Sequence, residues 1–235
     1  MLTIQDVHTF YGSSHVLHGI HLVIHRGDAV SVMGRNGAGK STLMRTIMGL
    51  TPARIGTITF DGVEIVRYSP HEVFRLGIKL VPQGRRVFPK LTVKENLQLA
   101  LVAQGGSDTR SELEKAYARF PILGQRRHQR VKGLSGGERQ MLAIARGLVG
   151  ETSVLLLDEP TEGLAPIVVK ELRDIFFEIK SEKMTIFLAE QNVKLALSAC
   201  DKHYILEKGE IQFDGSTDQI LANSEIMIQT LGVSG

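Results

Sequence analysis

The sequence has no tryptophan, a single cysteine and few aromatic residues, which make up 6% of its 235 positions. One cysteine, Cys200, excludes a disulfide within the chain and fits a reducing compartment, so a cytoplasmic location is expected. Its place in a helical pattern predicts a small packing residue. No stretch approaches the ~20 consecutive apolar residues of a membrane-spanning helix. The opening segment 1–12 lacks the basic start and apolar run of a signal peptide, which predicts that the mature protein begins here.

An excess of charge of one sign is also missing, because 28 Lys and Arg stand against 25 Asp and Glu. The densest basic run contains Arg126, Arg127, Arg130 and Lys132, a pattern that can bind nucleic acid or anionic lipid. No aromatic residue that could stack on a base is interleaved there, which favours a solvated face of the protein. We therefore expect no nucleic-acid partner.

Four histidines close in sequence, His15, His18, His21 and His25, raise the question of a metal site. On a strand, His21 and His25 would lie about 13 Å apart at ~3.3 Å per residue, too far to share one ion. His15 and His18 fall in the preceding turn, where they would approach only by accident of folding. We expect no structural metal from this cluster.

The length and the 43% hydrophobic content suffice for one large α/β domain, with or without a lobe. Ile20, Leu22 and Ile24 alternate with less apolar neighbours, which is typical of a half-buried strand. The segments 57–60 and 63–65 flank Asp61-Gly62, a strong hairpin signal. The start of the chain therefore predicts an antiparallel β layer.

Farther along, two short apolar runs at 154–157 and 185–189 enclose a segment with helical spacing. Strand, helix and strand at these lengths predict a crossover unit of a parallel sheet. The segment 92–132 is helical and charged, and we interpret it as a lobe inserted into the core. We expect one domain, with a core of 1–90 and 133–235 and a lobe of about 91–132. A strand pair at 204–206 and 210–213 and a short helical tail complete it.

A phosphate-binding loop follows the strand predicted at 29–33. Gly34, Gly39, Lys40 and Ser41 stand in the spacing G-x-x-x-x-G-K-[ST], and a helical run starts at Thr42. Backbone N–H groups of such a loop form an anion nest at a helix N-terminus. Lys40 would reach the β- and γ-phosphates, and the Ser41 hydroxyl would ligate Mg²⁺. The residues expected around the phosphates are Gly34, Arg35, Asn36, Gly37, Ala38, Gly39, Lys40, Ser41 and Thr42.

Two carboxylates follow the apolar run 154–157, at the carboxyl end of a buried strand, where open α/β sheets bind ligands. Asp158 is the natural partner of the Mg²⁺ water shell. Glu159 can polarise an attacking water as a general base. Carboxylates also end strands for solubility, but the phosphate loop upstream favours the catalytic interpretation.

A second glycine-rich signal, Leu134-Ser135-Gly136-Gly137-Glu138, resembles the signature motif of ABC-type ATPases. Together with the other motifs in their order, it makes the whole chain similar to the ATP-binding subunit of an ABC transporter. The resemblance implies a P-loop NTPase core of the α/β class, with an antiparallel β layer and a helical lobe. It also implies that Ser135, Gly136, Gly137 and Glu138 close over ATP held by a second ATPase subunit.

The resemblance carries over to single positions as well. Tyr11 stands where the family places an aromatic residue that stacks on adenine, with Val16 as a second wall. Gln83 matches the glutamine that senses Mg²⁺ and the attacking water, and the adjoining segment 85–89 is expected to face the membrane partner. Two positions depart from the pattern: Gln191 replaces a common histidine, and Ala165 stands where an aspartate is common. Gln191 can donate a hydrogen bond to the γ-phosphate but carries no charge.

Several segments, among them those around Gln83 and Gln191, look like one of the two ATP-binding subunits of a branched-chain amino-acid importer. The partners implied are integral membrane permease subunits, a like or unlike second ATPase and, indirectly, an extracytoplasmic substrate-binding protein. The implied place is the cytoplasmic face of the membrane. Urea or short amides are alternative cargoes. A soluble ABC ATPase acting on nucleic acid or ribosomes, and a nucleotide-switched module that hydrolyses poorly, are the other hypotheses.

Overall fold

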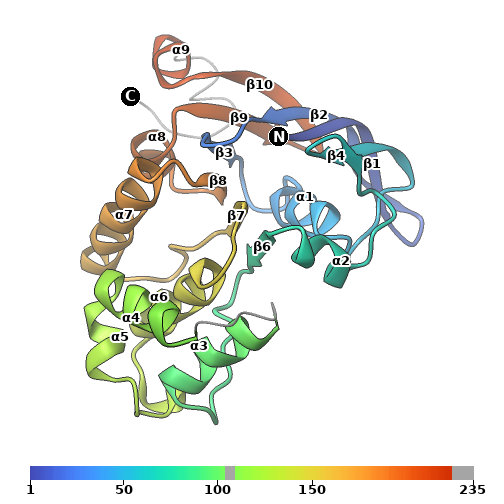
Figure 1. The fold of residues 1–235 in the computed structure, drawn as a ribbon. Helices are drawn as coiled ribbons and strands as arrows, with labels where there is room; N and C mark the ends of the chain where they lie inside the picture. Colours follow the sequence, from blue (N-terminus) through green and yellow to red (C-terminus); the bar gives the residue numbers. More distant parts are fainter. Residues whose placement is uncertain (104–108, 224–235) are drawn as a thin grey trace.

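The computed structural model describes residues 1–103 and 109–223, and its strands and helices form two sheets and a helical region (Figure 1). The strands are β1 (Leu2–Tyr11), β2 (Ser14–Ile24), β3 (Ala29–Met33), β4 (Ile55–Phe60), β5 (Val63–Glu64), β6 (Ile78–Val81), β7 (Val154–Asp158), β8 (Thr185–Glu190), β9 (Lys202–Glu207) and β10 (Glu210–Ser216). The helices are α1 (Lys40–Ile47), α2 (Pro70–Arg75), α3 (Val93–Val102), α4 (Thr109–Arg119), α5 (Pro121–Gln125), α6 (Gly136–Leu148), α7 (Pro166–Ser181), α8 (Val193–Ala199) and α9 (Thr217–Ala222), with a 3₁₀ turn at Val131–Gly133.

The antiparallel layer predicted at the start of the chain is confirmed as a four-stranded sheet in the order β2-β1-β4-β5. Its hairpin is where the Asp61-Gly62 pair indicated, with Phe60 opposite Val63. Asp61 and Gly62 have φ of 49° and 83°, so the turn needs two residues that tolerate the left-handed region. Strand β1, which periodicity did not identify, pairs with both β2 and β4.

The second sheet has six strands in the order β10-β9-β3-β8-β7-β6. The predicted crossover is confirmed, because β7 and β8 pair in parallel and α7 connects them. Strand β3 lies between β8 and β9, parallel to both. The predicted pair of β9 and β10 is antiparallel, and α9 follows it. The rest of the tail, residues 224–235, lies outside the described residues.

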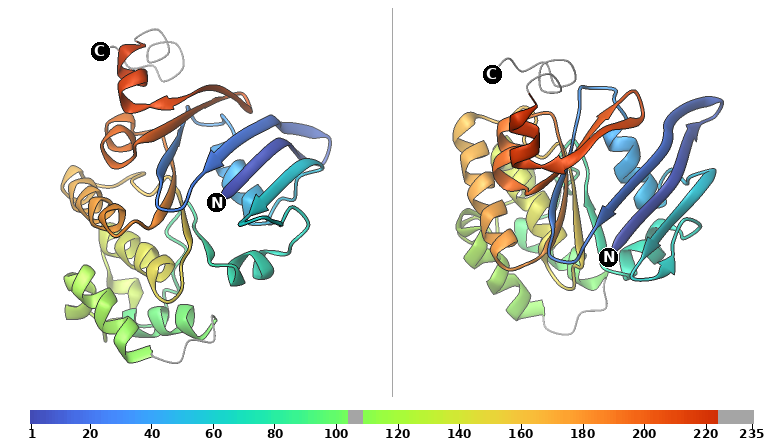
Figure 2. Two further views of the ribbon diagram at one scale, coloured as in Figure 1. Left: turned by 45° about the horizontal axis from the view of Figure 1, so that its top comes forward. Right: turned by 90° about the horizontal axis from the view of Figure 1, so that it is seen from above.

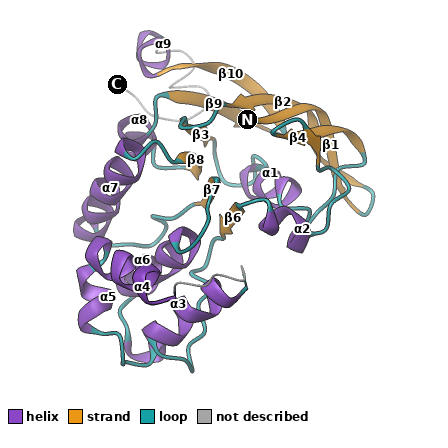
Figure 3. Ribbon diagram, in the orientation of Figure 1, coloured by secondary structure: helices purple, strands orange, loops and turns teal. Residues whose placement is uncertain are grey.

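Helices α3, α4, α5 and α6 gather at the end of the molecule away from the β layer (Figure 3). The segment 91–132 contains α3, α4 and α5, and its two ends meet through a bridge between Thr92 and Arg130. The N–H of Val93 donates to the carbonyl of Gln129, and that of Val131 to Leu91. The segment therefore leaves and rejoins the core at one neck. Helix α6 packs against α3 from the core side.

The two larger of the three hydrophobic clusters in the described residues hold the layers together. The first lies between the two sheets around α1 and includes Leu43, Met44 and Leu156, and Figure 2 shows α1 between the β layer and the six-stranded sheet. The second lies on the other face of that sheet, where α6 and α7 cover it, and includes Phe176. Cys200 belongs to this second core and is 2% exposed, which confirms its predicted packing role.

One side chain joins the two sheets by hydrogen bonds. Tyr204 of β9 is buried, and its Oη accepts from the N–H of Val23 at 3.0 Å and donates to the carbonyl of the same residue at 3.2 Å. Val23 lies on β2, in the other sheet. The phenol therefore satisfies two backbone groups that no neighbouring strand reaches on that edge of the described sheet.

We expect Tyr204→Phe to lower the free energy of unfolding by about 1–3 kcal/mol, because both Val23 groups lose their partner. Tyr117→Phe is the matched control, since the buried Tyr117 hydroxyl has no hydrogen-bond partner among the described residues and its removal should be neutral or stabilising. Urea denaturation of both variants measures the difference. Equal losses in the two would contradict this role of Tyr204.

Candidate nucleotide site

The phosphate loop, residues 34–39, connects β3 to α1 and packs closely against β9. A side chain at Gly34 would overlap the carbonyl oxygen of Leu206, and a Cβ at Gly39 would lie 2.9 Å from Leu17 Cδ2. Gly39 also has a φ of 113°, which L-residues rarely adopt. These two positions therefore need glycine to bring the loop over the end of the sheet and to start α1 there.

Lys40, the first residue of α1, is directed into the loop and toward the end of β7. Its Nζ donates to the carbonyls of Gly34 at 2.7 Å and Arg35 at 3.1 Å. The same Nζ forms an ion pair with Glu159 Oε1 at 2.9 Å, and both side chains are more than nine-tenths buried. Two residues from distant parts of the sequence thus share one buried contact.

Ser41 and Asp158 form a second contact across the same gap. Ser41 Oγ donates to Asp158 Oδ1 at 2.9 Å, and Asp158 is 4% exposed. Burial raises the pKa of Asp158, the nearby charge of Glu159 adds to this effect, and the Ser41 hydrogen bond opposes it. A hydroxyl and a carboxylate oxygen are hard donors of the kind that Mg²⁺ prefers, so this donor set fits that ion.

Gln83 reaches the same corner from the loop after β6. Its Nε2 donates to Glu162 Oε2 at 2.8 Å and to Glu159 Oε2 at 3.4 Å. The neighbouring Arg85 donates to the carbonyls of Glu162 and Gly163. The structure thus brings Gln83 to Glu159 and Glu162. The contacts of Glu162 were not predicted, because its position in a polar loop carries no periodic signal.

Ser135 caps the N-terminus of α6. Its Oγ accepts from the N–H of Glu138 at 3.2 Å, and Glu138 Oε2 accepts from the N–H of Ser135 at 2.7 Å. Glu138 also pairs with Arg126 at 2.6 Å. An added Cβ at Gly136 would lie 2.8 Å from Arg85 Nη1. The loop 134–138 is therefore rigidly capped, and Ser135 stays exposed at its tip.

Gln191 lies in an exposed turn immediately after β8. The residue before it, Glu190, is 2% exposed and accepts hydrogen bonds from Thr161, Gln191 and Asn192. Burial raises the pKa of Glu190, and the hydrogen bonds from Thr161 oppose this. Sequence reasoning missed Glu190, although a carboxylate directly after the apolar run 185–189 is the signal that could have found it.

The two predicted adenine contacts lie on either side of the turn of the β1–β2 hairpin, Tyr11 at the end of β1 and Val16 near the start of β2. Tyr11 is 43% exposed and its Oη accepts from Thr51 Oγ1 at 3.5 Å. A Cβ at Gly209 would overlap the carbonyl oxygen of Val16, and the N–H of Gly209 donates to the carbonyl of Ala38 in the phosphate loop. Gly209 therefore lies between Val16 and the phosphate loop and touches both.

The histidines of the first hairpin lie closer together than we expected. The rings of His15 and His18 have centroids 3.9 Å apart, and His15 Nε2 is 3.1 Å from His8 Nδ1. The expectation that His15 and His18 would stay apart in a turn is therefore wrong: both lie on β2, which begins at Ser14. In residues 1–103 and 109–223, no group of three or more His, Cys, Asp or Glu could hold a metal ion.

The chain matches the family model of ABC transporters over residues 17–162. The high-affinity branched-chain amino acid transport ATP-binding protein BraG of Pseudomonas aeruginosa is 40% identical, over 99% of this chain and 100% of BraG. The probable branched-chain amino acid transport ATP-binding protein LivF of Archaeoglobus fulgidus is 36% identical over 99% of both chains. A crystal structure of an ABC-transporter cassette in its ADP conformation superposes with a TM-score of 0.83 at 25% identity, covering 95% of this chain and 94% of that one.

The chain therefore belongs to the ABC transporter family, as one of its ATP-binding subunits. It is an ATPase, and the P-loop fold predicted from the sequence is confirmed. Among the described helices, none is long and apolar enough to cross a membrane.

The nucleotide-free protein should become more stable on Asp158→Asn. Because burial raises the pKa of Asp158, the contribution of this carboxyl to stability is present at acid pH and lost as the pH rises through its folded-state pKa. We expect the variant to gain about 1 kcal/mol at about pH 7 and nothing at acid pH. Thermal unfolding over that range measures it.

Asp174→Asn is the control, because Asp174 is exposed on α7. A variant at position 158 that is less stable than wild type throughout the pH range would contradict the argument.

Proposed function

We propose that this chain is the ATP-hydrolysing subunit that energises an ABC importer for branched-chain amino acids. One observation carries the proposal: Lys40, Ser41, Asp158, Glu159 and Gln83 meet beyond the carboxyl ends of β3, β7 and β6 in one parallel sheet. The names of BraG and LivF support the cargo. The sequence similarity to these two proteins extends over 99% of this chain, which favours a role in transport over action on nucleic acid or ribosomes.

In this proposal the nucleotide is held by residues from three segments. Lys40 and the backbone N–H groups of the phosphate loop bind the phosphates, and the hairpin residues Tyr11 and Val16 flank the adenine. The full set is Tyr11, Val16, Gly34, Arg35, Asn36, Gly37, Ala38, Gly39, Lys40, Ser41, Thr42, and from the second subunit Ser135, Gly136, Gly137 and Glu138. Ser41, Gln83 and Asp158 would hold Mg²⁺, which neutralises phosphate charge when bound.

Glu159 serves as the general base, and its buried ion pair with Lys40 holds the carboxylate in the site before ATP binds. Each charge is stabilised by the other in a site that excludes water. When Lys40 binds the phosphates of ATP in place of Glu159, the carboxylate of Glu159 is free to accept a proton from the attacking water. Gln83, which already donates to Glu159, and Gln191, at the end of β8, orient that water and the γ-phosphate.

Completion of the site requires a second ATPase subunit, like or unlike this one. Ser135 is exposed at the N-terminus of the 13-residue helix α6, whose free N–H groups and dipole attract anions. In the dimer, this loop closes on the nucleotide of the other subunit. Loss of the γ-phosphate removes these contacts, so the dimer reopens and the membrane subunits change their access state.

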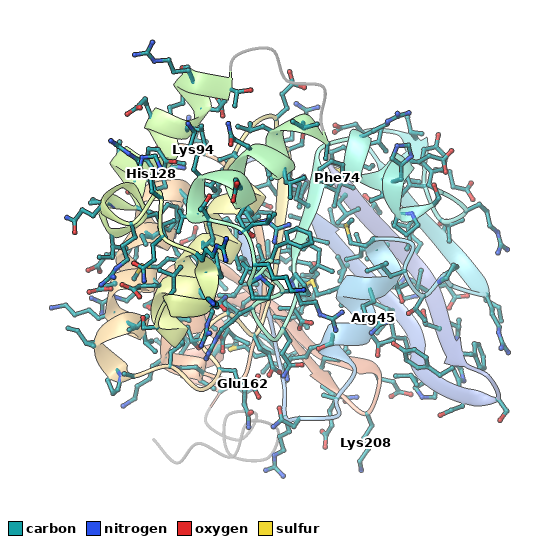
Figure 4. All side chains as sticks on the ribbon, turned by 90° about the horizontal axis from the view of Figure 1, so that it is seen from below. Arg45, Phe74, Lys94, His128, Glu162 and Lys208 are labelled. Atoms are coloured by element: carbon teal, nitrogen blue, oxygen red, sulfur yellow. The ribbon has the colours of Figure 1, made fainter. Side chains whose placement is uncertain are left out.

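Membrane permease subunits are proposed to bind a groove between the core and the lobe. The groove has a volume of about 670 Å³, and its walls come from α1, α2, β6, α3 and α6. Phe88 and Leu99 are exposed in it by 47% and 44%, and the guanidinium of Arg146 lies 4.9 Å from the Phe88 ring centroid. Figure 4 shows this face, with Arg45 and Phe74 of the groove and Glu162 of the catalytic corner.

This placement puts the chain at the cytoplasmic face of the membrane, with the lobe of about 91–132 toward the permease. The substrate-binding protein acts on the far side and has no contact with this chain. Segment 85–89, which includes Phe88, forms part of the groove and also carries Arg85 beside the catalytic corner. The groove and the nucleotide site therefore share one loop, through which permease movement reaches Gln83.

We expect Glu159→Gln to lower ATP turnover by about 10²–10⁴-fold, because the amide cannot accept a proton. The variant should keep ATP binding and form an ATP-stabilised dimer, measured by light scattering, and should abolish leucine uptake when it replaces wild type in the assembled transporter. Urea uptake is measured in the same wild-type transporter: uptake of leucine without urea supports the branched-chain amino-acid cargo, and uptake of urea without leucine contradicts it.

Glu64→Gln is the control, because Glu64 is exposed on the short strand β5. Unchanged turnover of the Glu159 variant sinks the catalytic assignment. Wild type that binds ATP but shows no turnover above the uncatalysed rate would instead identify a nucleotide-switched module.

Phe88→Ala should weaken association with the permease subunits by about tenfold or more, because buried aromatic anchors dominate interface energies. Val63→Ala removes an exposed apolar side chain from β5, outside the groove, and should not weaken it. Co-purification of the assembled transporter measures both. Equal retention of the permease by the two variants would contradict the docking site.

A further inference from the structure

The buried carboxylate of Glu190 connects two loops of the nucleotide site. Its Oε1 accepts from Thr161 N at 3.2 Å and from Thr161 Oγ1 at 2.6 Å. Its Oε2 accepts from the N–H groups of Gln191 at 3.1 Å and Asn192 at 3.0 Å. Each oxygen therefore serves one loop: the first serves the loop that follows Glu159, and the second serves the turn that contains Gln191.

These loops leave neighbouring parallel strands. Asp158 on β7 lies opposite Ala189 on β8, and the N–H of Glu159 donates to the carbonyl of Ala189 at 2.9 Å. The ladder between the two strands ends there. Beyond the ladder, the side chain of Glu190 continues the connection to Thr161 on one side and to Gln191 and Asn192 on the other.

We propose that Glu190 is a positioning residue that sets the spacing between Glu159 and Gln191. This inference rests on the proposed function, in which Glu159 activates water and Gln191 donates to the γ-phosphate. Because Gln191 carries no charge, its contribution depends on where its amide is held. Glu190 fixes the backbone of Gln191 and the loop of Glu159 through one rigid planar group.

A carboxylate suits this bridge because all four of its contacts come from donors. An ionised carboxylate has only acceptor sites, whereas the glutamine amide has one acceptor oxygen and one donor nitrogen. Glu190→Gln would therefore place an NH₂ group against the donors of one loop. The side chain is 2% exposed, so water cannot easily replace the lost partner.

The test compares three variants of the full chain. We expect Glu190→Gln to lower kcat about tenfold or more, since small displacements of reacting groups cost up to about 10²-fold, while the Kd for ATP changes less than about twofold. Thr161→Val removes one of the four contacts, and Glu190→Asp keeps both oxygens on a shorter arm. Both should fall between wild type and Glu190→Gln in kcat.

Thr185→Val is the matched control. Thr185 lies at the other end of β8, and its buried Oγ1 accepts from the N–H of Gly27 at 2.9 Å. The variant loses a buried hydrogen bond on the same strand and should show a lower Tm with an unchanged kcat. If Glu190→Gln loses kcat only in proportion to its Tm, as a general loss of stability would require, the positioning role is wrong.

Hydrogen exchange of the isolated chain, measured by mass spectrometry, tests the bridge without turnover. Peptides covering 159–165 and 190–193 should both exchange faster in Glu190→Gln and remain unchanged in Thr185→Val. Unchanged exchange in both loops overturns the proposal. A failure of Glu159→Gln to lose activity would refute the proposed function instead, and the exchange measurement would still test the bridge on its own.

Discussion

The parallel pairing of β3, β8 and β7 is the constraint on which the nucleotide site depends. Parallel strands end at the same edge, so Met33, Asp158 and Glu190 reach it together although they come from distant parts of the sequence. The register places Asp158 beside Ala189 and brings Lys40 within 2.9 Å of Glu159. A slip of one residue in β7 would turn these side chains to the opposite face.

The same edge of the sheet carries three buried charged side chains. Lys40, Asp158 and Glu190 are each less than 5% exposed, and burying a charge costs free energy unless a partner compensates it. Each has a local partner: Glu159 for Lys40, Ser41 for Asp158, and Thr161 with the turn at Gln191 for Glu190. The site is therefore a network in which every charge depends on a neighbouring loop.

Much of this arrangement could be predicted from the sequence, and the reasons differ by element. The limits of β3 were predicted because an apolar run ends at a glycine loop, and the β4–β5 hairpin because Asp61-Gly62 suits its turn. Strand β6 was missed, since four residues between Gly77 and Pro82 are too few to show a period. The helical character of 92–132 was predicted, but no periodic signal links Glu162 to Gln83, whose contact forms only in three dimensions.

Segment 85–89 connects the nucleotide site to the groove between the core and the lobe. This segment follows β6 in the sequence. Its Arg85 donates to the carbonyls of Glu162 and Gly163, and its Phe88 lines the groove. Asn96 of α3 holds this segment, because its side chain exchanges hydrogen bonds with both the N–H and the carbonyl of Phe88. Since Asn96 is fully buried, its hydrogen bonds to Phe88 are shielded from water, and segment 85–89 links α3 of the lobe, through Phe88, to the loop of Glu162, through Arg85.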